Sequence, residues 1–251
     1  MNTLFDLTGK TAIVTGAGTG LGLGMSLALA SAGADLVMVD LVERDAALAA
    51  VRARGRRAVS VVADLSTTRP IDAIMAAAMK EFGRVDILVN NAGIIRRQKA
   101  LEFTEKDWDD VMALNARSVF FLSQAAARDM AKRRYGKIVN IASLLSFQGG
   151  ILVPSYAASK AAVAQMTKAM ANEWAELGIT VNAIAPGYMA TDNTRALRED
   201  PVRSQAILQR IPAGRWGVPD DLGGAVVFLS AAASDYVNGH VLVVDGGWLA
   251  R

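Results

Sequence analysis

The chain has 251 residues, of which 52% are hydrophobic and 20% are charged; it has no cysteine and a single histidine, His240. These counts exclude disulfide scaffolds, thiolate zinc sites, iron–sulfur clusters, cysteine nucleophiles and histidine-rich metal sites, so we predict no bound metal. The net charge of +3 is small. We interpret its densest run, the arginines between positions 52 and 57, as a solvated helix end and loop rather than a nucleic-acid surface.

No segment is typical of a secreted or membrane protein. Residues 1–10 lack a basic stretch followed by an apolar one, so no signal peptide is expected. The longest uncharged stretch, 138–159, contains Asn140, Gln148 and Pro154 and is too polar for a transmembrane helix. We therefore expect a cytoplasmic protein that binds neither nucleic acid nor a membrane.

Short apolar runs alternate with longer helical patterns along the whole chain. The runs are rich in Val and Ile, and we predict strands over 11–14, 36–39, 58–62, 85–89, 137–141, 179–184 and 241–244. Helical patterns between them cover 21–31, 71–82, 106–130, 155–177 and 221–232. This alternation predicts one doubly wound, Rossmann-like α/β domain over 1–251, with a parallel sheet of about seven strands and helices on both faces. Ligands of such sheets bind outside the carboxyl ends of the strands.

A glycine-rich turn follows the first strand, with Gly16, Gly20 and Gly22 between a strand and a helix. Glycine lets a phosphate approach the backbone, and the helix N-terminus attracts its charge, so the turn predicts a dinucleotide cradle. Asp40 ends the second strand and would bind the adenosine ribose while repelling a 2′-phosphate, which favours NAD over NADP. Arg44 lies close enough to weaken that preference. The alternatives are an ordinary turn and, for Asp40, a helix N-cap.

Ser143 ends the fifth predicted strand, and Tyr156 and Lys160 follow it four residues apart. On a helix this spacing places the tyrosine and the lysine on one face. The ammonium group would stabilise a phenolate and lower the pKa of Tyr156, which would make the phenol a usable acid or base, and Ser143 could hold a substrate oxygen. Alone, the Tyr–Lys pair more often marks a surface helix.

Together these motifs resemble the short-chain dehydrogenase/reductase family, and the similarity extends over almost the whole chain. The resemblance implies that Tyr156 is the general acid/base, that Ser143 polarises the substrate oxygen, that Lys160 binds the nicotinamide ribose, and that Asn115 supports a water relay to Lys160. It also implies that Asp64 and Leu65 flank the adenine, that Asn90 lies beside the cofactor and that 186–191 contact the nicotinamide amide. The expected cofactor-binding residues are Gly16, Thr19, Gly20, Leu21, Gly22, Asp40, Asp64, Leu65, Asn91, Ala92, Gly93, Tyr156, Lys160, Pro186, Gly187, Met189 and Thr191.

Less general stretches, 91–97, 146–150, 185–194, 211–217 and 245–251, are similar to the 2-deoxy-D-gluconate 3-dehydrogenase branch, also called 2-dehydro-3-deoxy-D-gluconate 5-dehydrogenase. This similarity implies an NAD-linked reaction at a secondary hydroxyl or keto group of a six-carbon sugar acid, in pectin and uronate breakdown. An arginine binds a carboxylate through two parallel hydrogen bonds. The expected substrate-binding residues are Arg96, Arg97, Ser143, Gln148, Tyr156 and Arg195, the last on a lid around 190–215. Alternatively, these arginines are solvated or pair with acids such as Glu102 and Glu105.

Other functions stay open at this point. A gluconate 5-dehydrogenase or a 3-oxoacyl-carrier-protein reductase is the nearest alternative, and a non-catalytic dinucleotide-binding regulator is an alternative of another class. A Ser-His-Asp hydrolase is not expected, because no Gly-x-Ser-x-Gly elbow is present and His240 lies away from every motif. The family resemblance also implies a homotetramer that buries the helices over 106–130 and 155–177, although their alanines could equally face the chain's own core.

Overall fold

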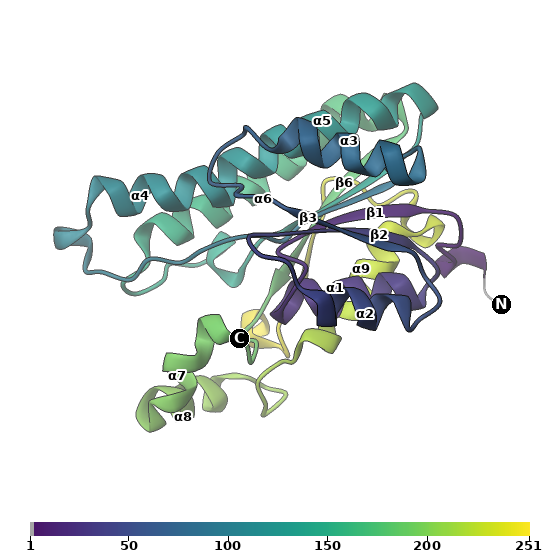
Figure 1. The fold of residues 1–251 in the computed structure, drawn as a ribbon. Coiled ribbons are helices and arrows are strands. Elements are labelled where there is room, and N and C mark those ends of the chain that lie inside the picture. Colours follow the sequence, from purple (N-terminus) through teal and green to yellow (C-terminus); the bar gives the residue numbers. More distant parts are fainter. Residues whose placement is uncertain (1–2) are drawn as a thin grey trace.

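The computed structural model describes residues 3–251, and its centre is a parallel sheet of seven strands (Figure 1). Their order in the sheet is β3-β2-β1-β4-β5-β6-β7. The predicted strands are confirmed, except that β4 begins two residues later than expected. Most of the strand residues are buried, which explains their continuous apolarity. The strands are β1 (Thr11–Thr15), β2 (Asp35–Asp40), β3 (Ala58–Val62), β4 (Ile87–Asn90), β5 (Gly136–Ile141), β6 (Ile179–Pro186) and β7 (Val241–Val244).

Helices cover both faces of the sheet (Figure 1). One hydrophobic core joins the sheet to α1 (Gly20–Ser31), α2 (Asp45–Arg52) and α9 (Gly223–Ser230). A second core joins the other face to α3 (Ile71–Phe82), α5 (Ser118–Arg133) and α6 (Pro154–Trp174), and α4 (Glu105–Met112) packs against α6. The doubly wound α/β architecture predicted from the sequence is therefore confirmed.

The helix expected over 106–130 is not continuous. A π-helical turn, Ala113–Arg117, separates α4 from α5. Residue spacing alone does not reveal such a turn, because the apolar face continues on both sides of it. The pattern over 155–177 corresponds to α6 followed by a short 3₁₀ turn, Ala175–Leu177, and the pattern over 221–232 is shortened to α9 by a 3₁₀ turn before it. Among residues 3–251, no helix combines the length and apolarity needed to cross a membrane.

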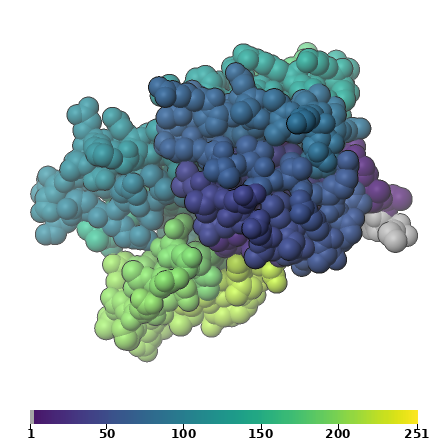
Figure 2. All heavy atoms as spheres, viewed as in Figure 1, coloured from purple at the N-terminus to yellow at the C-terminus, as the bar shows by residue number. Residues whose placement is uncertain are grey.

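The order of the strands reverses at β1, which lies between β2 and β4. At such a switch point the connections leave toward opposite faces of the sheet, and a crevice opens at the carboxyl ends of the strands. Two helices that the sequence analysis did not predict, α7 (Arg195–Glu199) and α8 (Pro201–Arg210), follow β6 on this side. They stand apart from both helical layers and form the green projection in the space-filling view (Figure 2).

Candidate active site

The turn between β1 and α1 forms a cradle that only glycine permits. Gly16 and Gly20 have φ angles of 61° and 51°, in the left-handed region. A Cβ added to Gly22 would lie 1.9 Å from the Gly16 carbonyl oxygen, so the backbone there is packed too closely for any side chain. Thr19 is the N-cap of α1, and its side chain makes no capping hydrogen bond. The free N–H groups of the first helical turn therefore suit the pyrophosphate of a dinucleotide.

The segment after β4 clamps this cradle from the other side. The Asn91 Nδ2 donates to the carbonyl oxygens of Thr15 and Gly16, at 2.8 and 3.2 Å. The Thr15 hydroxyl in turn accepts the N–H groups of Asn91 and Ala92, at 3.0 and 2.9 Å. These four hydrogen bonds hold two distant parts of the chain together, so the glycine turn keeps its shape before any ligand binds.

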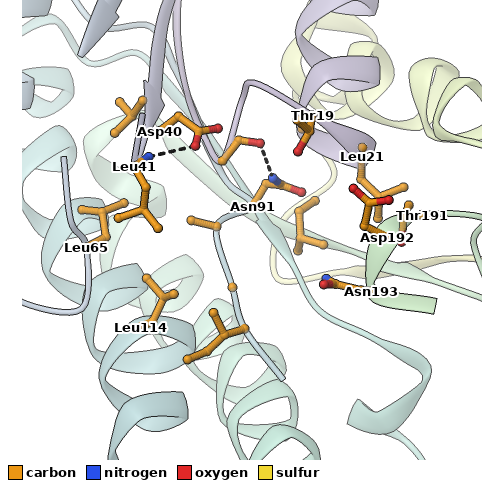
Figure 3. A pocket seen from close by; sticks show the side chains of 18 of the residues that line it. Thr19, Leu21, Asp40, Leu41, Leu65, Asn91, Leu114, Thr191, Asp192 and Asn193 are labelled. Carbon is orange, nitrogen blue, oxygen red and sulfur yellow. Dashed lines mark hydrogen bonds between the residues drawn. The ribbon is translucent and has the colours of Figure 1, made fainter. Parts of the chain in front are cut away.

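Asp40 lies at one end of the cleft, at the carboxyl end of β2 (Figure 3). Its carboxylate accepts the N–H groups of Gly18 and Leu41, at 2.9 and 2.8 Å. These bonds hold the negative charge at the cleft wall. Arg44 also packs near Gly18, where an added Cβ would lie 2.3 Å from its Cγ. Asp40 lines the cleft, whereas Arg44 is not among the lining residues.

The cleft brings together most of the residues expected to bind a cofactor. Its apolar end carries Leu41, Leu65 and Leu114, and the opposite end carries Thr191 and the residues that follow it (Figure 3). Expected residues that line the cleft are Gly16, Thr19, Gly20, Leu21, Gly22, Asp40, Asp64, Leu65, Asn91, Ala92, Gly93, Tyr156, Lys160 and Thr191. Lining residues that the sequence analysis did not name are Val39, Leu41, Ala63, Ile94, Leu114, Ile141, Asp192 and Asn193.

Four expected neighbours of the cofactor lie elsewhere. Pro186 and Gly187 line an adjoining cavity, and Met189 is buried against Gly217. The Asn90 side chain points into the protein interior, where its Nδ2 donates to the Ser123 hydroxyl and to the Asn140 Oδ1, at 2.9 and 2.8 Å. The alternation of side chains along a strand explains this last difference, because Asn90 and Asn91 leave the backbone on opposite sides.

Tyr156 lines both the nucleotide cleft and the adjoining cavity, while Lys160 lines the first and Ser143 the second. The Lys160 Nζ lies 5.6 Å from the centre of the Tyr156 ring and donates to the Ile141 carbonyl oxygen at 2.6 Å. Burial lowers the pKa of Lys160 to about 8. Burial also raises the pKa of Tyr156, while a hydrogen bond with Ser143 and the positive charge of Arg97 lower it. Arg97 is thus a cation that favours the phenolate, which the sequence analysis did not foresee.

Local hydrogen bonds fix the backbone around these side chains. Ser143 is the N-cap of the 3₁₀ turn Leu144–Ser146, and its hydroxyl accepts the Leu145 N–H at 3.2 Å. The Ser146 hydroxyl donates to the Lys160 carbonyl oxygen at 2.7 Å. The turn after β5 is thereby tied to α6, which holds Ser143 beside Tyr156.

Asn115 occupies the π-helical turn and is completely buried. Its Oδ1 accepts the Ile94 N–H, and its Nδ2 donates to the Ile94 carbonyl oxygen, both at 2.9 Å. The Nδ2 also donates to the Ser159 hydroxyl at 3.2 Å. Asn115 thus joins the segment after β4 to α6, which is a common setting for a π turn, since such turns concentrate at functional sites.

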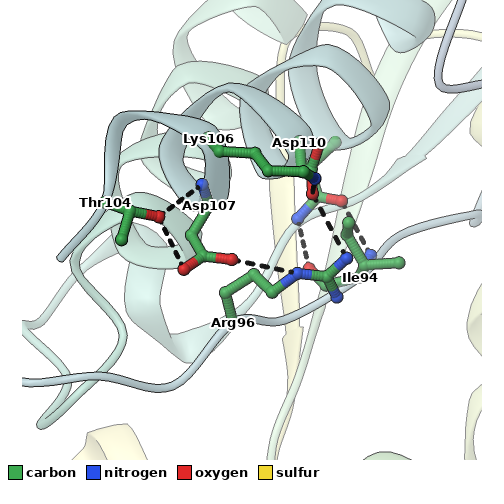
Figure 4. Close-up of polar contacts among 7 residues, drawn as sticks. Ile94, Arg96, Thr104, Lys106, Asp107 and Asp110 are labelled. Carbon is green, nitrogen blue, oxygen red and sulfur yellow. Dashed lines mark hydrogen bonds and ion pairs between the residues drawn. The ribbon is translucent and has the colours of Figure 1, made fainter.

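The four residues expected to bind substrate besides Ser143 and Tyr156 have different surroundings. Arg97 and Gln148 line the second cavity, where Arg97 donates to the Asn193 carbonyl oxygen at 2.9 Å. Arg96 points away and bridges the carboxylates of Asp107 and Asp110, at 3.5 and 3.4 Å (Figure 4). Arg195 is exposed, pairs with Asp192 and does not line the cavity. The acidic partners are thus aspartates, not Glu102 or Glu105.

The second cavity also includes residues that the sequence analysis did not name as site residues. Arg203 and Arg210 come from α8, and Tyr188 and Trp248 form an aromatic wall with their ring centres 4.6 Å apart. The Trp248 Nε1 donates to the Gln148 Oε1 at 3.2 Å. The spacing of Arg203 and Arg210, two turns apart on one helix face, is the signal that could have found them, had α8 been predicted.

Comparisons with known proteins agree with this geometry. The family model described as short chain dehydrogenase matches residues 10–202. The 2-dehydro-3-deoxy-D-gluconate 5-dehydrogenase of Escherichia coli K12 is 62% identical over 98% of both chains. Two solved structures are also similar over nearly their full lengths. A provisionally assigned 2-deoxy-D-gluconate 3-dehydrogenase of Agrobacterium tumefaciens with bound NADP is 52% identical, with a TM-score of 0.91 over 100% of both chains.

The second structure is the gluconate 5-dehydrogenase of Burkholderia cenocepacia in complex with NADP and tartrate. It is 42% identical, with a TM-score of 0.95 over 99% of this chain and 98% of that one. The family match covers more than half of the chain. The sequence identities of 42–62% over nearly the full length are higher than a shared fold alone requires. The chain therefore belongs to the short-chain dehydrogenase family and is an oxidoreductase that uses a nicotinamide dinucleotide.

Proposed function

We propose that this protein is an NAD-linked dehydrogenase that interconverts a secondary hydroxyl and a keto group of a keto-deoxy sugar acid, of the 2-dehydro-3-deoxy-D-gluconate 5-dehydrogenase type. The observation that carries the proposal is the position of Tyr156, which lines both the nucleotide cleft and a second cavity. That cavity is lined by three arginines and by no acidic residue. Such a lining suits an anionic substrate, and the name of the Escherichia coli relative supports the same class.

Residues of this chain supply the proton chemistry of the proposed reaction. The nicotinamide, when bound, donates or accepts the hydride. Tyr156 gives a proton to the substrate oxygen during reduction and removes it during oxidation. Ser143 donates a hydrogen bond to the same oxygen as its charge develops. Lys160 and Arg97 place positive charge near the phenol, which favours the phenolate needed for oxidation.

Asp40 supports NAD as the preferred cofactor. Its carboxylate lines the cleft and is held there by two backbone N–H groups. A 2′-phosphate at this point would meet a fixed negative charge, whereas ribose hydroxyls would donate hydrogen bonds to it. The related Agrobacterium and Burkholderia structures contain NADP, so both cofactors belong in the assay below.

We propose a cytoplasmic homotetramer that acts in uronate breakdown. Exposed apolar side chains on two different elements would be covered in such an assembly. Phe121 on α5 is 39% exposed, and Val243 on the edge strand β7 is 36% exposed. Light scattering of the purified protein would give the subunit number, and a monomer would contradict the proposed assembly.

The proposed activity is tested by following NADH absorbance with the purified protein. The substrates to compare are 2-dehydro-3-deoxy-D-gluconate with its oxidised partner, D-gluconate with its 5-keto form, and a 3-oxoacyl thioester, each with both cofactors. We expect the highest kcat/KM for the keto-deoxy acid with NAD(H). Activity confined to acyl thioesters with NADPH would reject the proposal, and activity confined to gluconate would replace it with the gluconate 5-dehydrogenase alternative.

A further inference from the structure

The charges that line the second cavity are all positive. Arg97, Arg203 and Arg210 line it, and within residues 3–251 none of the three forms an ion pair. In contrast, Arg96, with Asp107 and Asp110, and Arg195, with Asp192, each pair with aspartate outside the cavity. Three guanidinium groups without a carboxylate partner make the cavity wall positive, so the cavity favours an anionic occupant.

Arg203 and Arg210 belong to one face of α8. Residues 203, 207 and 210 follow the helical repeat, so their side chains lie along the same side of the helix. Ile207 lies between them, is 7% exposed, and packs with Leu144 and Trp248 in a small hydrophobic cluster. That contact turns this face of α8 toward the cavity and brings both arginines to its wall.

Arg210 is held in place by the aromatic wall. Its Cζ lies 4.0 Å from the centre of the Trp248 ring, a cation–π contact. Trp248 is 4% exposed and is itself fixed by its hydrogen bond to Gln148. The Arg251 Nε donates to the Arg210 carbonyl oxygen at 3.2 Å, which fixes the end of α8 as well. A guanidinium held by this contact loses less entropy on binding a carboxylate than an unrestrained one does.

The three arginines lie near different parts of the cavity wall, with Arg210 against Trp248. The charge of Arg97 acts on Tyr156, where it lowers the pKa of the phenol. The charges of Arg203 and Arg210 act on Tyr188, where they oppose the rise in pKa that burial causes. Arg97 is thus near the reacting end, and the α8 arginines are near the aromatic wall. In a 5-dehydrogenase substrate, the reacting carbon 5 and the carboxyl carbon 1 are at opposite ends of the carbon chain.

We infer that Arg203 and Arg210 of α8 bind the carboxylate of the sugar acid while Ser143 and Tyr156 hold its reacting oxygen, an inference that rests on the proposed function. Arg97 then lies beside the reacting oxygen rather than on the carboxylate, to which the sequence alone assigned it. The two α8 arginines determine specificity for an acid over a neutral sugar.

The test compares D-gluconate with its neutral amide, D-gluconamide, as probes. Their dissociation constants are measured by calorimetry with NADH present, for the unaltered protein and for Arg203→Gln and Arg210→Gln. Arg198→Gln is the matched control, because Arg198 lies on the same lid and loses the same charge but does not line the cavity. We expect each α8 variant to bind gluconate at least about tenfold more weakly, a loss of roughly 1.4 kcal/mol, with gluconamide binding nearly unchanged. The control should leave both constants nearly unchanged.

A kinetic measurement separates this inference from the proposed function. With 2-dehydro-3-deoxy-D-gluconate, the α8 variants should raise KM and leave kcat within about threefold of the unaltered enzyme. If the unaltered protein turns over no sugar acid, the proposed function fails, and the calorimetry still decides the carboxylate site. The inference is overturned if the unaltered protein does not bind gluconate, if the variants keep their affinity for it, or if gluconate and gluconamide weaken in equal proportion.

Discussion

Single residues decide what the two cavities do, and Tyr156 is the residue they share. Replacement of Tyr156 by Phe removes the only atom that exchanges a proton in the proposed reaction and leaves the ring in place. We expect kcat to fall by a factor on the order of 100 to 10,000. NADH affinity, measured by fluorescence titration, should stay within about twofold of the unaltered protein. Tyr236→Phe is the control, because Tyr236 is fully exposed; near-normal turnover by Tyr156→Phe would rule out its role as acid and base.

The carboxylate of Asp40 is the group that we expect to set the preference for NAD over NADP. Asp40→Asn removes the negative charge but keeps an oxygen that accepts a backbone N–H group. The KM for NADP should then fall by about tenfold, because a 2′-phosphate no longer meets a carboxylate, while the KM for NAD should rise. Steady-state kinetics with both cofactors measure this change. Asp45→Asn, at the exposed start of α2, is the matched control. An unchanged NADP-to-NAD ratio in Asp40→Asn would mean that another residue sets the preference.

Some side chains of the site can be predicted from the sequence, and others cannot. The glycine turn, Asp40 and the Tyr–Lys pair were predictable because their chemistry depends on local spacing. Arg96 and Arg97 were not distinguishable, since they are adjacent and chemically identical. Only the fold reveals that Arg96 meets the aspartates of α4 while Arg97 lines the cavity.

Among the elements, the π turn between α4 and α5 has the clearest energetic role. Asn115→Ala removes both hydrogen bonds that its side chain makes with the Ile94 backbone. Partly buried backbone groups of Ile94 left without these partners should lower the free energy of unfolding by about 1–3 kcal/mol. Because Ile94 lines the nucleotide cleft, NADH binding should weaken as well. Urea denaturation and NADH titration measure the two effects.

The control for this prediction lies at the other end of the same helical segment. Thr104 is the N-cap of α4, and its hydroxyl accepts the Asp107 N–H at 3.1 Å. Thr104→Ala should cost about 1 kcal/mol of stability and leave NADH binding unchanged. If both variants weaken NADH binding to the same extent, the weaker binding results from a general destabilisation of α4 and not from loss of the Asn115 hydrogen bonds.

Strands were easier to predict than lid helices, for a physical reason. A strand buried on both faces is mostly apolar, so the run at 36–39, in which all four residues are apolar and buried, is visible in the sequence. In α8 only Ile207 is buried, and the other residues are exposed or partly buried. Its position depends on tertiary contacts with Leu144 and Trp248, which no local pattern encodes. The arginines on it were therefore missed.

At the scale of the whole molecule, the buried ammonium of Lys160 makes stability depend on pH. Burial lowers its pKa from 10.5 to about 8. Below pH 8 the lysine is charged in both states, so the folded protein bears the full cost of burying the charge. Between pH 8 and 10.5 only the unfolded chain binds this proton, so folding becomes more favourable as the pH rises. This contribution amounts to about 3 kcal/mol over the full interval.

The prediction is tested by urea denaturation at pH 7 and at pH 9.5. Lys160→Met removes the titrating group, so the unaltered protein should gain stability relative to this variant as the pH rises. Lys168, an exposed residue of the same helix, gives the control variant Lys168→Met, for which we expect no such gain. A difference between the unaltered protein and Lys160→Met that does not change with pH would show that burial of Lys160 does not govern its titration.

The hydrogen bonds that join Asn91 to Thr15 and Gly16 have a further consequence for how the protein folds. They connect residues 75 and 76 positions apart in the chain. The first three strands can assemble and bring Asp40 to Gly18. The opposite wall of the nucleotide cleft, however, is formed by residues that follow β4, and Thr191 joins it only after β6 has formed. Contacts between such distant segments form late, because the entropy of loop closure opposes them. We therefore expect the dinucleotide to bind only after β6 is in place, so that it stabilises the folded state and has no effect on the early steps of folding.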